Sequence, residues 1–146
     1  MPTPYLIVSS SREAIDFYTR ALGAKEIVRL EMPDGKIGHA ELDFAGEALM
    51  LADEFPELGF VSPARLGGSA VSLYLRVPDV DAAHAPALAA GAREREAPAD
   101  QIDGDRRSAI IDPFGHAWSL ATRKEDVLPA ELVRRFRASM NSGEQR

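Results

Sequence analysis

Two residues in the first half of the chain carry side chains suited to acid–base chemistry. His39 and Glu41 are two positions apart on a predicted strand, and alternation along a strand places both on one face. An imidazole oriented by a carboxylate can act as a general base or as a hydrogen-bond partner for a ligand. The same two groups can also form a sheet pair that local hydrogen bonds satisfy, and the sequence leaves both interpretations open.

The other polar candidates indicate structural roles. His116 falls in a turn before Trp118 and is expected to make structural hydrogen bonds, while His84 falls on a predicted helix and is expected at the surface. Asp43 is expected in a turn. Three histidines spaced in this way do not form a recognisable metal motif. The chain has no cysteine, which excludes disulfides, thiolate metal sites and thiol nucleophiles.

The elements that must position these residues occur twice. When the chain is shifted against itself by about 69 positions, Asp34-Gly35 falls on Asp103-Gly104 and Asp43 falls on Asp112. Each copy predicts a strand, a helix and three further strands. Duplicated units of this kind can pack into one cupped sheet with a site between them.

The chain divides into four segments along this repeat. The first module is predicted at 1–54, a linker at 55–70, the second module at 71–123, and a C-terminal amphipathic helix with a disordered tail at 124–146. The total of 146 residues is the length of one domain. The linker carries apolar residues between prolines and glycines, so it either covers a site or simply tethers the two halves.

Composition narrows the class of partner. The formal net charge of -6 argues against a nucleic-acid-binding face, which would be basic. No apolar segment reaches the length that spans a bilayer, and the first residues do not begin a signal peptide. A cytoplasmic protein without a membrane partner is therefore expected.

Several motifs occur in an order that is typical of a known superfamily. They are Tyr5-Leu6-Ile7-Val8, Ala14-Ile15-Asp16-Phe17-Tyr18, Gly35-Lys36-Ile37-Gly38-His39-Ala40-Glu41-Leu42, Met50-Leu51-Ala52-Asp53-Glu54 and Asp112-Pro113-Phe114-Gly115-His116-Ala117-Trp118. Across roughly residues 4–125 the chain resembles the vicinal oxygen chelate superfamily of glyoxalases, bleomycin-resistance proteins and extradiol dioxygenases, and is most similar to its PhnB-like branch.

The resemblance implies an α+β fold of two tandem βαβββ modules. Their strands would form a curved, eight-stranded, partly closed sheet with helices on the convex face. Members of the superfamily are commonly homodimers, with the concave cavity near the partner chain. One scaffold carries unrelated chemistries in this superfamily, so the residues of the cavity decide the function.

Metal enzymes of this superfamily hold a divalent ion with His and Glu side chains from the first and last strands of each module. The corresponding positions here fall on Thr3 or Tyr5, on Met50, on Ser72 and on Ser119. A thioether is a soft ligand and a serine hydroxyl is a poor ligand for a divalent ion. The resemblance therefore predicts a cavity without a metal or other cofactor.

The remaining residues of the predicted cavity suit an organic ligand. Trp118 is expected on the opposite, core-facing side, and Asp105 and Arg106 are expected as an ion pair at the cavity mouth or as a solvated surface pair. A largely apolar cavity with a few hydroxyls fits a planar or greasy molecule. The predicted ligand-binding residues are Tyr5, Ile7, His39, Glu41, Met50, Ser72, Tyr74, Arg76, Arg106 and Ser119.

Two functions follow from these expectations. The first is a metal-free protein of the bleomycin-resistance type that sequesters a small organic ligand, such as an antibiotic or an aromatic natural product. The alternative is a metal-dependent lyase, isomerase or dioxygenase of the same superfamily that uses His39 and Glu41. A ligand-free regulatory domain is a third possibility.

Overall fold

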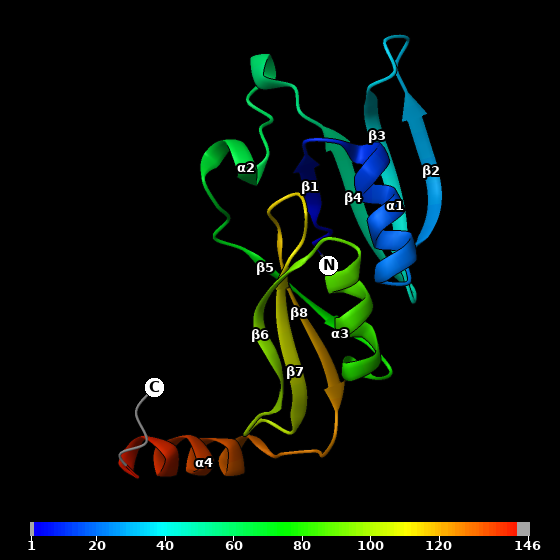
Figure 1. Ribbon diagram of the computed structural model, residues 1–146. Helices are drawn as coiled ribbons and strands as arrows, with labels where there is room; N and C mark the ends of the chain where they lie inside the picture. Colours follow the sequence, from blue (N-terminus) through cyan, green and yellow to red (C-terminus); the bar gives the residue numbers. More distant parts are fainter. Residues whose placement is uncertain (1, 143–146) are drawn as a thin grey trace.

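The computed structural model describes residues 2–142 and contains two modules of the same topology, joined by a linker (Figure 1). In the first module the sheet order is β1-β4-β3-β2, and β1 runs parallel to β4. In the second module the order is β5-β8-β7-β6, and β5 runs parallel to β8. The elements of the first module are β1 (Tyr5–Val8), α1 (Ser11–Ala21), β2 (Lys25–Glu31), β3 (Ile37–Phe44) and β4 (Glu47–Asp53). Those of the second are β5 (Ser72–Arg76), α3 (Val80–Ala89), β6 (Arg93–Asp100), β7 (Asp105–Ile111) and β8 (Ala117–Arg123).

This topology confirms the predicted α+β fold of two tandem βαβββ modules. The eight strands form two four-stranded sheets within the described chain, and the sheets do not close on each other. Each sheet is therefore complete within its own module, and each leaves one face without a helix.

The helix of each module begins at a side-chain cap that the sequence supplies. Ser10 accepts a hydrogen bond from the backbone N–H of Glu13 at the start of α1, and Asp79 accepts from the backbone N–H groups of Asp81 and Ala82 at the start of α3. After α1 the chain turns at Gly23, whose φ of 77° is in the left-handed region. The caps fix where each helix begins, and so which side chains meet the sheet.

Alternation gives the first sheet two different faces. Leu6 and Val8 of β1 are buried in the core on which α1 packs. Tyr5 and Ile7 point to the opposite face, which no helix covers. On that uncovered face Tyr5 pairs with Met50 and Ile7 pairs with Ala52. The site described below lies there.

A buried carboxylate joins the two modules. Asp112 accepts hydrogen bonds from the Tyr18 hydroxyl at 2.5 Å and from the Trp118 indole N–H at 2.9 Å, and also from two backbone N–H groups of its own turn. His116 contacts the backbone carbonyl of Ile7 through Nε2 at 3.0 Å. The structural role expected for His116 and the core position expected for Trp118 are confirmed.

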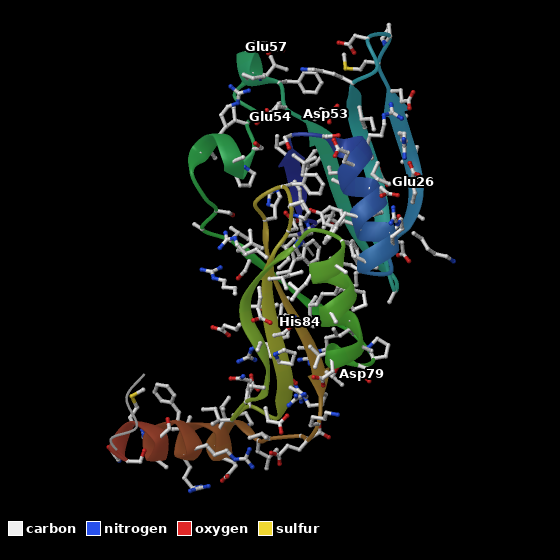
Figure 2. All side chains as sticks on the ribbon, viewed as in Figure 1. Glu26, Asp53, Glu54, Glu57, Asp79 and His84 are labelled. Carbon is white, nitrogen blue, oxygen red and sulfur yellow. The ribbon has the colours of Figure 1, made fainter. Side chains whose placement is uncertain are left out.

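The surface position expected for His84 is wrong. His84 is only 5 % exposed, on the side of α3 that faces the second sheet (Figure 2). Its Nδ1 lies 2.8 Å from the hydroxyl of Ser108, and its Nε2 lies 2.8 Å from the carboxylate of Glu94. The surrounding helix is rich in alanine, so no contrast between apolar and polar residues marked which side packs against the strands.

The linker and the C-terminal segment complete the chain. The linker contains a short 3-10 helix, η1 (Pro56–Leu58), and one helical turn, α2 (Pro63–Leu66). The C-terminal helix α4 (Pro129–Asn141) begins at a proline within the predicted segment 124–146, and it projects from the far end of the second module (Figure 1). Most of the predicted disordered tail, residues 143–146, lies outside the described residues. No helix between residues 2 and 142 is long and apolar enough to cross a membrane.

Candidate ligand-binding site

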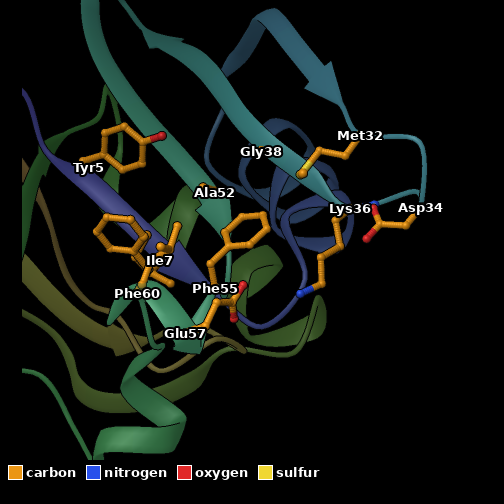
Figure 3. Close-up of a pocket in the computed structure, with 11 residues that line it drawn as sticks. Tyr5, Ile7, Met32, Asp34, Lys36, Gly38, Ala52, Phe55, Glu57 and Phe60 are labelled. Atoms are coloured by element: carbon orange, nitrogen blue, oxygen red, sulfur yellow. The ribbon is translucent and has the colours of Figure 1, made fainter.

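A cavity of about 880 Å³ lies between the uncovered face of the first sheet and the linker (Figure 3). The strands contribute its floor, and the linker contributes one wall. The β2–β3 turn closes another side with charged residues. The lining residues are Tyr5, Ile7, Met32, Asp34, Lys36, Gly38, Ala52, Phe55, Glu57, Leu58 and Phe60.

The linker wall is built around two phenylalanines. Phe55 and Phe60 exchange backbone hydrogen bonds of 2.8 and 3.1 Å, and Gly59 turns the chain between them with a φ of 85°. A residue with a β-carbon rarely adopts that φ, so the glycine permits the tight turn. Both aromatic rings are thereby held against the same cavity (Figure 3). The linker therefore covers a site, which was one of its two expected roles.

A carboxylate anchors the linker to the end of β4. Glu54 accepts a hydrogen bond of 2.7 Å from the backbone N–H of Ser62 and pairs with Arg65. Hydrogen bonds from Ser62 and Arg65 lower the pKa of Glu54 to about 2. The carboxylate is thus ionised throughout the neutral range, and it holds the linker in place.

The charged groups at the cavity are partly engaged with the protein itself. The ammonium of Lys36 lies 4.8 Å from the centre of the Phe55 ring and donates to the carbonyl of Glu54 at 3.1 Å. Asp34 accepts a hydrogen bond from the backbone N–H of Lys36. Lys36 therefore stiffens the aromatic wall, and the lining is otherwise mainly apolar.

A chain of hydrogen bonds runs across the uncovered face from the cavity to β3. The Tyr5 hydroxyl lies 2.8 Å from Nδ1 of His39, and Nε2 of His39 lies 2.9 Å from Oε2 of Glu41. Burial and the nearby charge of Glu41 raise the pKa of Tyr5, so the phenol keeps its proton at neutral pH. The structure thus brings together three of the predicted site residues, and both ring nitrogens of His39 have partners.

The predicted site residues of the first module share one face. Tyr5 and Ile7 line the cavity, whereas Met50 lies beside Tyr5 on the same face and outside the cavity lining. His39 and Glu41 reach the cavity through Tyr5. Sequence reasoning missed Phe55 and Phe60 as lining residues, although apolar residues in a linker rich in Pro and Gly were a visible signal.

The predicted residues of the second module form a separate cluster. Ser72, Tyr74 and Arg76 lie on the uncovered face of the second sheet, where Tyr74 pairs with Ser119. They do not line the cavity of the first module. The hydroxyl of Tyr74 and the guanidinium of Arg76 both donate to Asp105, so these side chains are engaged in the protein's own contacts.

The expected pair of Asp105 with Arg106 is wrong. Asp105 pairs with Arg76 and Arg123, while Arg106 pairs with Asp81 of α3 and with Asp100. Arg106 therefore lies on the helix-covered side of β7. The next residue along the strand, Arg107, points to the other face and donates to Tyr74 at 2.9 Å. The expectation was off by one position, and a shift of one residue reverses the face of a strand residue.

Burial and hydrogen bonding act in opposite directions on Asp105. Its side chain is only 2 % exposed, and burial alone would raise the pKa of the carboxyl. Donation from Tyr74, Arg76 and Arg123 outweighs burial and lowers the pKa of Asp105 to about 2. The uncovered face of the second sheet therefore carries an ion network around Asp105, and a smaller cavity of about 480 Å³ lies at the other end of that face, beside Arg93, Ile111 and Ala117.

The divalent ion of the superfamily's metal enzymes does not fit the donors present at the corresponding positions. The positions predicted for the metal ligands carry Thr3 or Tyr5, Met50, Ser72 and Ser119. Their groups are hydroxyls, a phenol and a thioether, and none is a preferred neutral-pH ligand of a hard or borderline divalent ion. No group of three His, Cys, Asp or Glu side chains within residues 2–142 is arranged to hold a metal.

The paired βαβββ topology and the cavity on a helix-free sheet face define a class of proteins that use one scaffold for binding and for catalysis. A model of the Glyoxalase/Bleomycin resistance protein/Dioxygenase superfamily matches residues 3–120. The chain belongs to this superfamily, as the sequence motifs predicted.

Relatives extend over most of the chain. The protein Mb0911c of Mycobacterium bovis is 42% identical over 133 residues, which cover 89% of this chain and 88% of the relative. The crystal structure of the Arabidopsis thaliana gene product At5g48480 has a TM-score of 0.66 and 30% identity, and the match covers 83% of this chain and 97% of that one. The fosfomycin resistance protein FosX of Listeria monocytogenes, solved with Mn(II), has a TM-score of 0.65 and 17% identity over 93% of this chain and 96% of its own. At that identity FosX shows the fold alone.

Proposed function

We propose that the protein binds a small, mainly apolar organic molecule, with an aromatic part, in the cavity of the first module, and that it does so without a metal. The observation that carries this proposal is the 880 Å³ cavity walled by Phe55, Phe60, Ile7 and Tyr5. Cavities of this size and lining are typical of small-molecule sites. Aromatic walls favour a planar ligand through offset and edge contacts.

We propose that the protein sequesters this ligand, as a protein does that protects a cell from an antibiotic or a toxic natural product. The resistance described for FosX supports this class of function only by analogy of fold.

We propose that the protein works in the cytoplasm as a homodimer. Exposed apolar residues on and near the open sheet faces, among them Ile27, Leu30 and Tyr74, support burial against a second copy.

The alternative is a metal-dependent lyase, isomerase or dioxygenase that uses His39 and Glu41. Both ring nitrogens of His39 are already hydrogen-bonded, one to Tyr5 and one to Glu41. Ligation of a metal would require His39 to release one of these partners. The contacts therefore favour binding over metal catalysis.

The proposal is tested by titrating purified protein with small aromatic probes, first naphthalene and indole, in the presence of a chelator. Saturable binding is expected, with chemical-shift changes at Ile7, Phe55 and Phe60. In the variant Phe60→Ala the dissociation constant is expected to rise about tenfold, since a large aromatic contact is removed. Phe136→Ala is the matched control because Phe136 is similarly exposed, at 53 % against 49 %, and lies on α4 away from the cavity.

Two results would contradict the proposal. One is an absence of saturable binding up to the solubility limit of the probes. The other is an equal effect of the two phenylalanine substitutions, which would place binding outside the cavity. Binding that appears only after a divalent metal is added, and is lost in His39→Ala, would support the alternative function.

A further inference from the structure

The direction of each hydrogen bond in the chain from Tyr5 to Glu41 follows from the chemistry of its last member. An ionised carboxylate can only accept, so the contact of 2.9 Å between Glu41 and Nε2 of His39 requires the proton to be on Nε2. A neutral imidazole carries one proton, so Nδ1 of the same ring is then an acceptor. Glu41 therefore fixes the tautomer of His39.

The tautomer of His39 in turn fixes the orientation of the Tyr5 hydroxyl. In the neutral ring Nδ1 has no proton, so in that form the contact of 2.8 Å has Tyr5 as its donor. The single proton of the phenol is then engaged on the side away from the cavity. What remains free on the Tyr5 oxygen is its ability to accept.

The position of Tyr5 makes this free lone pair available to a ligand. Its ring lines the cavity together with Ile7 and Phe60, and the residue is about half exposed (Figure 3). The hydroxyl is directed toward the strands (Figure 3), where it contacts Nδ1 of His39. Around the cavity the other lining groups from β1, β3 and β4 are apolar, so Tyr5 is the polar group contributed by its strand floor.

We propose that the cavity selects aromatic ligands that carry an N–H or O–H donor, because Glu41 and His39 hold the Tyr5 hydroxyl as an acceptor. This inference rests on the proposed function and names the ligand class for the same site: indoles, phenols and aromatic amines rather than molecules with acceptors only. Tyr5 contacts the ligand, while His39 and Glu41 are positioning residues. A ligand that offers only a carbonyl cannot donate to the Tyr5 oxygen and would place its own lone pairs against it, which lowers its affinity.

The test compares two bicyclic probes of similar size. Indole carries an N–H donor, whereas 1-indanone carries only a carbonyl acceptor. The measured quantity is the ratio of their dissociation constants at neutral pH, obtained by titration of the full chain. Differences in hydrophobicity between the probes cancel when this ratio is compared between variants.

In Tyr5→Phe the preference for indole is expected to fall about tenfold relative to the unmodified protein, the worth of one hydrogen bond. In Glu41→Lys the new ammonium can only donate, so the proton moves to Nδ1 and the Tyr5 hydroxyl turns to donate into the cavity. The preference is then expected to reverse toward 1-indanone. Nitrogen-15 spectra of His39 are expected to show the change of tautomer.

Asp43→Lys is the matched control because it reverses a charge on the same strand, and Asp43 contacts the backbone N–H of Gly46 rather than His39. It is expected to leave the ratio unchanged.

If both probes bind and the ratio is the same in Tyr5→Phe, the selection by Tyr5 is overturned while the proposed function stands. If the ratio falls in Tyr5→Phe but Glu41→Lys leaves both the ratio and the tautomer unchanged, the positioning role is overturned. If neither probe binds the unmodified protein, the proposed function itself fails.

Discussion

The two modules share a topology and a tyrosine at the same place, yet their open faces have become different kinds of surface. Tyr5 pairs with Met50 on one sheet and Tyr74 pairs with Ser119 on the other. Tyr5 lies beside a cavity and bonds to a histidine, while Tyr74 lies within an ion network and bonds to Asp105. The same backbone therefore carries a cavity of about 880 Å³ at the tyrosine of one half and an ion network at the tyrosine of the other.

The physical difference lies in what the neighbouring strand and linker supply. At the first face Gly38 leaves room for the side chain of Met32, and the linker brings Phe55 and Phe60 over the sheet. At the second face the strand register makes Arg107 the counterpart of His39, because Glu41 pairs with Met50 as Ala109 pairs with Ser119, and Arg107 bonds to Tyr74. The first-strand tyrosine therefore contacts a histidine in one copy and an arginine in the other, and the linker phenylalanines lie over the first copy.

The largest expected effect comes from breaking the buried hydrogen bonds of Asp112, which are among the contacts between the two halves. Asp112→Ala leaves the hydroxyl of Tyr18 and the indole N–H of Trp118 buried without partners. The free energy of unfolding is expected to fall by about 3 kcal/mol or more, since each buried unsatisfied donor costs 1–3 kcal/mol. Urea denaturation measures this change.

A matched control for that experiment is Asp126→Ala, because the Asp126 side chain is 97% exposed. It is expected to leave the denaturation midpoint almost unchanged. An equally small effect of Asp112→Ala would show that the contact between the modules does not depend on this carboxylate.

An intermediate effect is expected at the second face. Asp105→Asn weakens the contacts with Tyr74, Arg76 and Arg123 and is expected to cost about 1–2 kcal/mol of stability at neutral pH, while probe binding in the first module stays unchanged. Because the native pKa of Asp105 is about 2 against an ordinary 3.8, its contribution is complete above the ordinary value. It is lost as the pH falls from about 4 to about 2.

The stability difference between the unmodified protein and Asp105→Asn is therefore expected to shrink over that acid range. Thermal denaturation at a series of pH values measures it. A difference that stays constant with pH would mean that the carboxylate is not stabilised by its network. A loss of probe binding in Asp105→Asn would mean that the two faces are not independent.

The smallest expected effect comes from weakening the ion pair that holds the linker at the first face. Glu54→Gln keeps an acceptor for the N–H of Ser62 but removes the charge paired with Arg65. The dissociation constant for indole is expected to rise two- to fivefold, roughly, because the aromatic wall is less firmly held. Glu47→Gln, at the exposed start of β4, is the control. An unchanged affinity would show that the wall keeps its place without this ion pair.

Particular residues show where sequence reasoning succeeded and where it could not. Tyr5 and Ile7 alternate with Leu6 and Val8, so their shared face was predictable from a period of two. Arg106 was assigned to the wrong face because Asp105, Arg106 and Arg107 are all polar and offer no alternation. His84 was misplaced for a similar reason, since an alanine-rich helix has no distinct apolar side.

The sequence by itself determined the duplicated topology, the turns and caps, and the shared face of His39 and Glu41, because these depend on local backbone preferences and on short periods. Only the tertiary structure decided that the linker phenylalanines close over the first sheet, that Asp112 joins the modules, and that Tyr5 reaches His39 across β4. These contacts join residues far apart in the chain. Such contacts depend on how loops and sheets pack in three dimensions, and no local pattern encodes that packing.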